Sequence, residues 1–238
     1  MAYDVYDIAN VCAFRLTQLD QVTNNLANAS TPGFKAERLT FGAQYEDVQS
    51  SREERPQELP RVRIDYTQGS HQKTDNSLDV ALEGEGFFTV KTKEGIAYTR
   101  RGNFRLNTDG ELVTDAGDQV LGESGPVKIK GQTVLIDRQG QISVDGSPAG
   151  RLRIVRFGNM QNLVRTGNGL FTDPGNAEPA KPESVEVASG YLELSNVNAI
   201  KEMVEMIDIQ RSFEIYQKVI QSISDQDKLS TSRVGKLI

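Results

Sequence analysis

The chain has 238 residues, of which 27 are basic and 33 acidic, and its formal net charge is −6. One Cys, one His and no Trp exclude an internal disulfide framework and leave little for cysteine- or histidine-based metal sites, and the negative charge argues against a protein that mainly binds nucleic acid phosphates. No apolar run approaches the ~18 residues of a membrane span, and the N-terminus lacks the basic start and apolar stretch of a secretory signal.

The first predicted element is a helix from about Asp4 to Asn28. This stretch contains no Pro or Gly, and its apolar residues fall mostly three or four positions apart, which is the narrow periodicity of a coiled-coil seam. We expect the helix to end near Pro32 and Gly33, because Pro cannot continue the backbone ladder and Gly accepts the conformations that terminate it.

The middle of the chain has a different pattern. From Gly42 to Pro60 it is polar and charged with little to bury, which predicts an extended connector, followed by a strand near Val62 and Ile64. Beyond it, short runs of alternating apolar residues are separated by turn signals such as Asp109-Gly110. Short strands at this spacing are typical of a β-sandwich or an open barrel.

The last predicted element is a helix from Asn196 to about Leu229, again free of Pro and Gly. Its apolar residues form two series, one at Val197, Ile200, Val204 and Ile207 and a second at Met206, Ile209, Phe213, Tyr216, Ile220 and Ile223. Because a helix with one covered face shows one apolar stripe, this helix is expected to need more than one neighbour.

These elements predict an α+β fold. Long N- and C-terminal helices are expected to pair as a coiled-coil-like layer, with a central all-β domain inserted between them. The expected segments are an N-terminal helix (1–35), an extended connector (36–70), the β domain (71–185) and a C-terminal helix (186–238).

The side chains that carry chemistry form no catalytic set. His71 lies in a polar loop without a partner at metal-ligand spacing, and Cys12 falls on the apolar seam of the first helix, where it behaves as a small hydrophobe. Glu83 and Glu85 allow a glycosidase interpretation, but a turn before the strand at Phe87 explains the glycines beside them more simply. We therefore expect no enzyme, no cofactor, no metal and no small-molecule substrate, and keep a β-sandwich hydrolase as a minor alternative.

Three blocks of sequence, in order along the chain, resemble one family. They are Asn24–Lys35; then Ser77–Leu82, Gly86–Phe88 and Tyr98–Phe104; then Ser189–Asn198, Glu202–Ile207 and Gln210–Glu214. They resemble the flagellar basal-body rod and hook proteins, whose N-terminal signature is an Asn-Leu-Ala-Asn stretch followed by Thr-x-Gly-(Phe/Tyr). The short chain and the stretch Val120–Val127 favour the proximal, FlgF-type, rod proteins over the distal, FlgG-type, ones.

The resemblance implies a structural subunit of the flagellar rod, the drive shaft across the periplasm. Its implied partners are copies of itself, other rod proteins and, during secretion, the flagellar type III export apparatus. The terminal helices would form the inner layer of a helical assembly. A scaffold or cap protein that assists rod assembly without remaining in it is a further alternative.

The predicted assembly interface lies at both ends of the chain. At the N-terminal end it comprises Leu16, Leu19, Asn24, Asn25, Leu26, Asn28, Thr31, Gly33 and Phe34. At the C-terminal end it comprises Ser195, Asn196, Val197, Asn198, Met206, Ile209, Phe213, Tyr216, Ile220 and Ile223.

The asparagines in this set have two interpretations. They either cap helix ends or hydrogen-bond to neighbouring subunits and set the stacking register, and Asn196 is a candidate N-cap of the last helix. Because helices with uncovered apolar faces are marginal alone, we also expect both ends to be largely unstructured in the free subunit.

Overall fold

The computed structural model describes residues 2–41, 60–175, 179–180 and 185–234. The chain divides into two compact units. The described residues of the helical unit are 2–27, 37–41, 60–63 and 198–234, and those of the β unit are 28–36, 64–175, 179–180 and 185–197. Each unit therefore contains segments that are far apart in the sequence.

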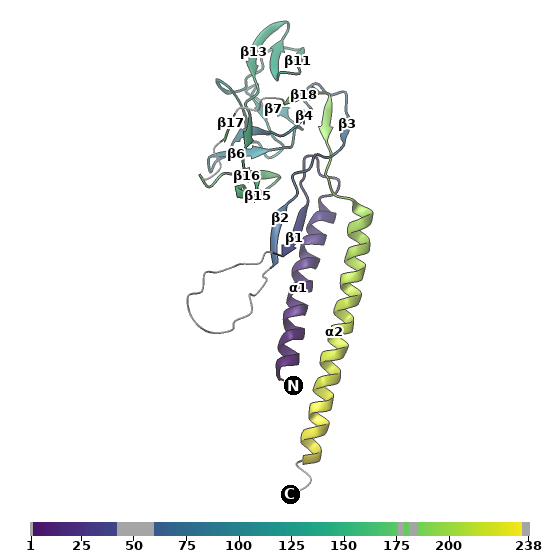
Figure 1. Ribbon diagram of the computed structural model, residues 1–238. Coiled ribbons are helices and arrows are strands. Elements are labelled where there is room, and N and C mark those ends of the chain that lie inside the picture. The colour runs from purple at the N-terminus through teal and green to yellow at the C-terminus, as the bar shows by residue number, and fades with distance from the viewer. Residues whose placement is uncertain (1, 42–59, 176–178, 181–184, 235–238) are drawn as a thin grey trace. The chain divides into compact units, whose positions relative to one another are not determined.

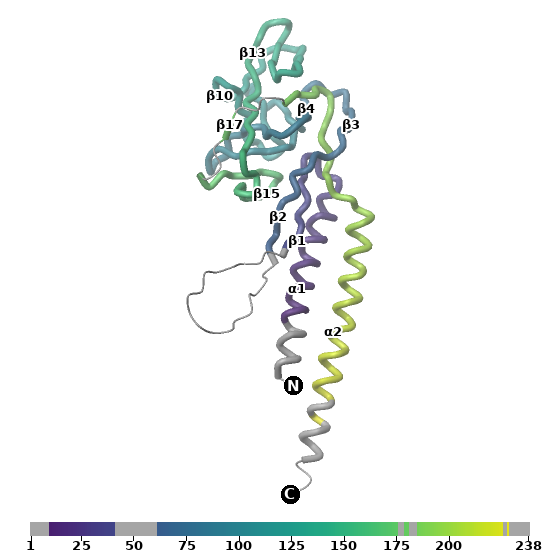
Figure 2. The backbone as a smooth tube through the Cα atoms, in the orientation of Figure 1, coloured from purple at the N-terminus to yellow at the C-terminus, as the bar shows by residue number. Residues whose placement is uncertain are grey.

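The helical unit is built from both ends of the chain. It contains α1 (Ala2–Ala27), β1 (Glu37–Phe41), most of β2 (Pro60–Ile64) and α2 (Ala199–Val234). The two helices lie side by side and run antiparallel (Figures 1 and 2), and β1 pairs with β2 and contacts α1. Each helix begins and ends within a few residues of its predicted bounds, in a stretch that lacks the residues that break a helix.

The start of α2 is fixed by Asn198. Its side-chain Oδ1 accepts a hydrogen bond from the backbone N–H of Lys201 at 3.1 Å, and its carbonyl accepts one from Glu202 at 3.0 Å. This is the geometry of an N-cap. The prediction that Asn196 caps this helix is therefore wrong, since the cap lies two positions later.

The prediction of an α+β fold with a coiled-coil-like helix layer is also wrong. The described residues contain just two α-helices, one at each end, and the central region is mostly sheet. Strands are not confined to that region either, because β1 lies against α1. The helices do pair, but their contact includes polar groups and is not a purely apolar seam. Hydrogen bonds join Asn25 to Glu202 and Gln18 to Glu205. Periodicity identifies residues that share a helix face and leaves open what covers that face.

The β unit contains the remaining strands and a 3-10 helix, Met160–Asn162. The strands are β3 (His71–Lys73), β4 (Val80–Glu83), β5 (Phe87–Lys91), β6 (Ile96–Thr99), β7 (Arg105–Leu106), β8 (Leu112–Val113), β9 (Gln119–Gly122), β10 (Gly125–Pro126), β11 (Val134–Ile136), β12 (Gln141–Val144), β13 (Ser147–Arg151), β14 (Ile154–Phe157), β15 (Val164–Gly167), β16 (Leu170–Thr172), β17 (Pro179–Ala180), β18 (Glu186–Ser189) and β19 (Tyr191–Glu193).

The largest sheet has the strand order β15-β16-β6-β5-β9-β8-β7, with β10 paired to β9, β14 to β5, and β17 to β14. The strands β11, β12 and β13 form a second sheet, and β18–β4 and β19–β3 form antiparallel pairs. In the β19–β3 pair, Glu193 stands opposite His71. These pairs join the C-terminal part of the unit to its N-terminal part.

The core of the β unit lies on both faces of β5. Phe88 and Val90 belong to one apolar cluster, whereas Phe87 belongs to a second. Because successive side chains of a strand point to opposite faces, β5 is buried on both sides. The second cluster is aromatic, with Phe87 making edge contacts to Phe157 at 5.8 Å and to Phe171 at 5.7 Å between ring centroids.

Tyr66 packs against this aromatic cluster and gives a first testable prediction. Its hydroxyl is buried with no hydrogen-bond partner among the described residues, and burial raises its pKa to about 12, opposed by the nearby charge of Arg165. A pKa raised in the folded state stabilises the fold at pH values below the unfolded pKa of about 10, and that stabilisation is lost as pH rises toward 12.

We therefore expect Tyr66→Phe to be at least as stable as the parent chain at pH 8, because it removes a buried hydroxyl that has no partner among the residues described, and to lose less stability than the parent between pH 10 and 12. Urea unfolding curves of both proteins at pH 8, 10 and 11 measure this difference. Equal losses in the two proteins over this range would contradict the assignment.

Candidate functional site

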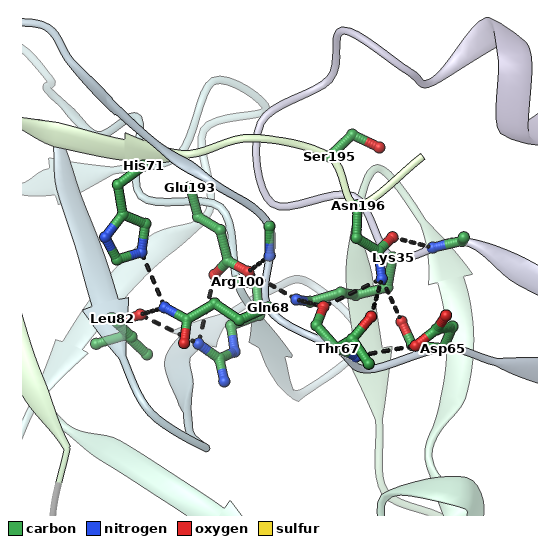
Figure 3. A network of polar contacts seen from close by, with 12 residues as sticks. Lys35, Asp65, Thr67, Gln68, His71, Leu82, Arg100, Glu193, Ser195 and Asn196 are labelled. Carbon is green, nitrogen blue, oxygen red and sulfur yellow. Dashed lines mark hydrogen bonds and ion pairs between the residues drawn. The ribbon is translucent and has the colours of Figure 1, made fainter. Parts of the chain in front are cut away.

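Three charged side chains meet in the interior of the β unit. The Lys35 ammonium lies 2.6 Å from Glu193 Oε1, and an Arg100 guanidinium nitrogen lies 3.4 Å from Glu193 Oε2. Their side chains are 1%, 4% and 0% exposed for Lys35, Arg100 and Glu193 respectively. We call this cluster of Lys35, Arg100 and Glu193 the buried ion node (Figure 3).

Backbone groups complete the hydrogen bonding of the node. Lys35 donates to the Thr67 carbonyl at 2.7 Å, Arg100 donates to the Gly84 carbonyl at 2.6 Å, and the N–H of Gly69 donates to Glu193 Oε1 at 3.0 Å. The node therefore connects the segment after α1, the segment before β3, the end of β6 and the end of β19. A buried charge is tolerated only when it is paired and hydrogen-bonded in this way.

Burial disfavours the charged forms of the two cations of the node. Burial lowers the pKa of Lys35, and attraction to Glu193 acts in the opposite direction. The pKa of Arg100 is likewise lowered by burial, with Glu193 opposing the shift. Glu193 is thus the shared counter-ion of two desolvated cations, which gives the node a structural role.

Gly33 approaches the node through its backbone. Its N–H donates to the Glu193 carbonyl at 2.7 Å, and its φ of +67° is one that side-chain-bearing residues rarely adopt. A Cβ at this position would lie 2.6 Å from the Arg100 carbonyl carbon and from the Arg101 nitrogen. The backbone at Gly33 packs directly against the backbone of Arg100 and Arg101, and no side chain fits between them.

We expect Gly33→Ala to lower the free energy of unfolding by about 2–4 kcal/mol, because it adds a backbone clash to the cost of a positive φ. Gly117→Ala is the matched control, since Gly117 has a φ of +90° but open space around its Cβ position, and it should cost about 1 kcal/mol. Thermal unfolding of both variants checks this, and equal losses would contradict it.

The predicted N-terminal interface residues differ widely in exposure. Leu16 is 47% exposed and Asn25 only 1%. Asn24 is exposed; Leu19, Leu26, Asn28 and Thr31 are half-buried; Gly33 and Phe34 are buried. The Phe34 ring lies under the Arg165 guanidinium at 4.5 Å, inside the β unit.

Asn25 makes its hydrogen bonds within the chain. Its Oδ1 accepts from the Glu37 N–H at 2.8 Å, its Nδ2 donates to the Glu37 carbonyl at 2.9 Å, and Nδ2 lies 3.3 Å from a Glu202 carboxylate oxygen. The amide thus pairs with the start of β1 as a neighbouring strand would. The structure gives this side chain a role inside the subunit.

The predicted C-terminal interface residues fall on both sides of the boundary between the units. Asn198 is exposed, Ile220 is 37% exposed and Ile209 is 2% exposed. Ser195, Asn196, Val197, Met206, Phe213, Tyr216 and Ile223 are half-buried. Nothing in the isolated chain tests their role in assembly, which stays a prediction.

One face of α2 is turned toward α1. Glu202 accepts from Asn25 at 3.3 Å, Glu205 accepts from Gln18 at 3.1 Å, and Ile209 is buried. At 100° per residue these positions share a face of the helix. The later members of the predicted interface lie on the same face. The predicted series Met206 to Ile223 therefore lies on the side of α2 that α1 partly covers.

The opposite face of α2 is apolar and exposed. Ile200 is 76% exposed, Met203 47%, Val204 54% and Ile207 45%. We call these four residues the uncovered stripe. They were not among the predicted interface residues, although Ile200, Val204 and Ile207 belong to the first apolar series seen in the sequence.

The buried ion node was not predicted from the sequence. Lys35, Arg100 and Glu193 each lie in one of the three blocks that resemble the rod and hook proteins. The sequence carries no local signal that these three charges are buried, because a charged residue is ordinarily exposed.

Among the described residues, no group of three or more His, Cys, Asp or Glu is placed to hold a metal ion, and neither helix has the length and hydropathy of a membrane span. Of the two carboxylates of the glycosidase alternative, Glu85 lies 2.9 Å from the Arg156 guanidinium and Glu83 lies 3.9 Å from the His71 ring.

Comparison with known proteins gives consistent matches along the chain. Residues 15–35 match the family model of the flagella basal body rod protein, residues 81–144 that of the flagellar hook protein FlgE/F/G D1 domain, and residues 188–231 that of the flagellar basal body rod FlgEFG protein C-terminal region.

Relatives match over nearly their whole length. The flagellar basal-body rod protein FlgF of Caulobacter vibrioides is 32% identical over 92% of this chain and 93% of its own. FlgF of Salmonella typhimurium is 33% identical over 95% and 96%, and the rod protein FlgG of Buchnera aphidicola is 36% identical over 86% and 89%. The resemblance seen in the sequence motifs is confirmed, and the chain belongs to the flagellar basal-body rod protein family.

Proposed function

We propose that this chain is a rod subunit that assembles helically through its terminal helices, as part of the drive shaft that crosses the periplasm. The observation that carries the proposal is the uncovered stripe of α2, on which four large apolar side chains are 45–76% exposed. Full burial of such a side chain contributes about 1.5–3 kcal/mol. A subunit that left the stripe in water would lose this contribution.

The stripe lies on the face of α2 opposite the one that contacts α1, so it supports a contact between different surfaces of neighbouring subunits. A contact of that kind, whose rotation does not close, propagates into an open helix. We propose the helices of adjacent rod subunits, copies of this chain or of other rod proteins, as its occupants. A filament built this way needs no enzymatic activity, in keeping with relatives that are named as rod proteins.

Both FlgF-named and FlgG-named relatives match this chain. We propose the proximal, FlgF-type, position because of the stretch Val120–Val127, with delivery through the flagellar type III export apparatus. We also propose that both ends of the chain are largely unstructured in the free subunit until they dock.

Mass spectrometry of purified basal bodies, with electron microscopy of basal bodies from a deletion strain, tests the proposal. We expect the protein in the finished rod and no complete rod in the deletion strain. A protein required for the rod but absent from purified basal bodies would instead be an assembly scaffold. Activity on a panel of glycans together with intact rods in the deletion strain would identify a hydrolase.

A further inference from the structure

Three segments that are far apart in the sequence are joined beside the buried ion node. They are Gly33–Ala36, Asp65–Ser70 and Glu193–Asn196, and we call them together the clasp. Asp65 N–H donates to the Ala36 carbonyl at 2.8 Å, and Leu194 N–H donates to the Ser70 carbonyl at 2.8 Å. The clasp lies entirely within the β unit.

The Asn196 side chain lies at the centre of the clasp (Figure 3). Its Oδ1 accepts from the Ala36 N–H at 2.7 Å, and its Nδ2 donates to the carbonyls of Asp65 at 2.8 Å and Thr67 at 3.1 Å. Its own backbone N–H donates to the Phe34 carbonyl at 3.4 Å. One amide therefore contacts both of the other segments.

The first segment of the clasp is far better buried than the helices that flank it, whereas residues Asp65–Ser70 are half-buried or exposed. Phe34, Lys35 and Ala36 are 6%, 1% and 3% exposed. Along α2, by contrast, Glu202 and Ile209 are the buried positions among the residues described. Segments with few buried contacts open at low free energy, whereas segments in the core open only when the unit unfolds.

The clasp also adjoins both helices along the chain. Helix α1 ends at Ala27, shortly before Gly33, and α2 begins at Ala199, shortly after Asn196. Two helices that are tethered at one place meet at a much higher effective concentration than two helices that are not tethered.

We propose that the clasp is formed in the free subunit before the helices pair, and that it keeps the last turn of α1 and the first turn of α2 close together so that the two helices pair when the subunit docks. This proposal rests on the proposed assembly function, and deepens it by assigning a device that controls the order of folding. Asn196 acts here as a positioning residue.

Amide hydrogen exchange of the full-length free subunit tests the clasp directly. We expect the Ala36 amide, which donates to Asn196, to exchange as slowly as core amides such as that of Val90 and at least 100-fold more slowly than the Ile207 amide in α2. Exchange of the Ala36 amide within 10-fold of the Ile207 rate would overturn the proposal. This measurement uses the unaltered chain, so it does not depend on how a variant folds.

A pair of variants then tests the consequence for assembly. Asn196→Ala removes the side-chain bonds of the clasp, whereas Asn198→Ala is the matched control that removes only the cap of α2. We expect Asn196→Ala to speed exchange at Ala36 at least 10-fold and to reduce incorporation into basal bodies at least 10-fold, while Asn198→Ala leaves exchange at Ala36 unchanged.

The outcomes separate this inference from the proposed function. If Asn196→Ala loosens Ala36 and the chain still enters rods at the parent level, the clasp has no part in assembly and the inference is wrong. If Ala36 is protected in the parent but the parent is absent from purified basal bodies, the clasp stands as a folding device and the proposed function fails.

Discussion

Replacing Glu193 by Gln is expected to lower the free energy of unfolding of the β unit by about 3–5 kcal/mol, the range found when one partner of a buried ion pair is removed. At 2–4 °C per kcal/mol for a unit of this size, the midpoint of thermal unfolding should fall by roughly 6–20 °C. Gln preserves the shape and can still accept from the Gly69 N–H. The loss therefore reports the charge that Lys35 and Arg100 require.

Two further measurements assign the effect to the node. Glu186→Gln is the matched control, because Glu186 is 58% exposed and its contact with Arg138 is 3.8 Å long; it should change stability by less than about 0.5 kcal/mol. Adding Lys35→Met to Glu193→Gln removes one stranded cation and should restore part of the loss. If Glu193→Gln unfolds like Glu186→Gln, the node contributes nothing and the assignment is wrong.

The pH dependence of the same variant provides an independent check. Without Glu193, burial is the dominant influence on the pKa of Lys35 and lowers it further. The unfolded chain then binds more protons than the folded chain, so stability rises with pH. The deficit of Glu193→Gln relative to the parent should therefore shrink as the pH is raised from 7 toward 10.

The second large effect is expected at the uncovered stripe. Met203→Glu combined with Ile207→Glu should leave the stability of the free subunit within about 0.5 kcal/mol, because both positions are exposed. In a rod the same carboxylates would be desolvated without partners, which costs several kcal/mol. Since 1.4 kcal/mol is a factor of ten, incorporation should fall at least 100-fold.

Gln210→Glu controls for charge, since it places a carboxylate at an exposed polar position of the same helix. Basal bodies from cells expressing each variant can be compared by quantitative mass spectrometry and by swimming assays. Normal incorporation of the double variant would show that the stripe is not an assembly surface.

The sequence predicted the two helices well because their signals are local. The absence of Pro and Gly and the spacing of apolar residues placed α2 from Asn196 to Leu229, and it runs from Ala199 to Val234. The error at its start arose because Asn196 and Asn198 are both suited to capping. Tertiary contacts with Ala36 and Asp65 use Asn196 instead, and these cannot be read from local sequence.

The faces of the helices were harder to assign. Both apolar series of α2 were visible, yet the series chosen as the interface lies on the side that α1 covers, because hydrogen bonds from Gln18 and Asn25 orient the helix. Polar contacts of this kind leave no periodic signal. Buried charges such as Glu193 are invisible for a similar reason, since a charged residue in a sequence is ordinarily read as exposed.

The most direct test of the account is the accessibility of the uncovered stripe before and after assembly. In a chain with Cys12→Ala, a thiol introduced by Ile207→Cys can be labelled with a water-soluble maleimide in the free subunit and in purified basal bodies. We expect labelling in basal bodies to be at least 100-fold slower than in the free subunit, with full labelling recovered on denaturation. Equal labelling rates in the two states would contradict the central claim.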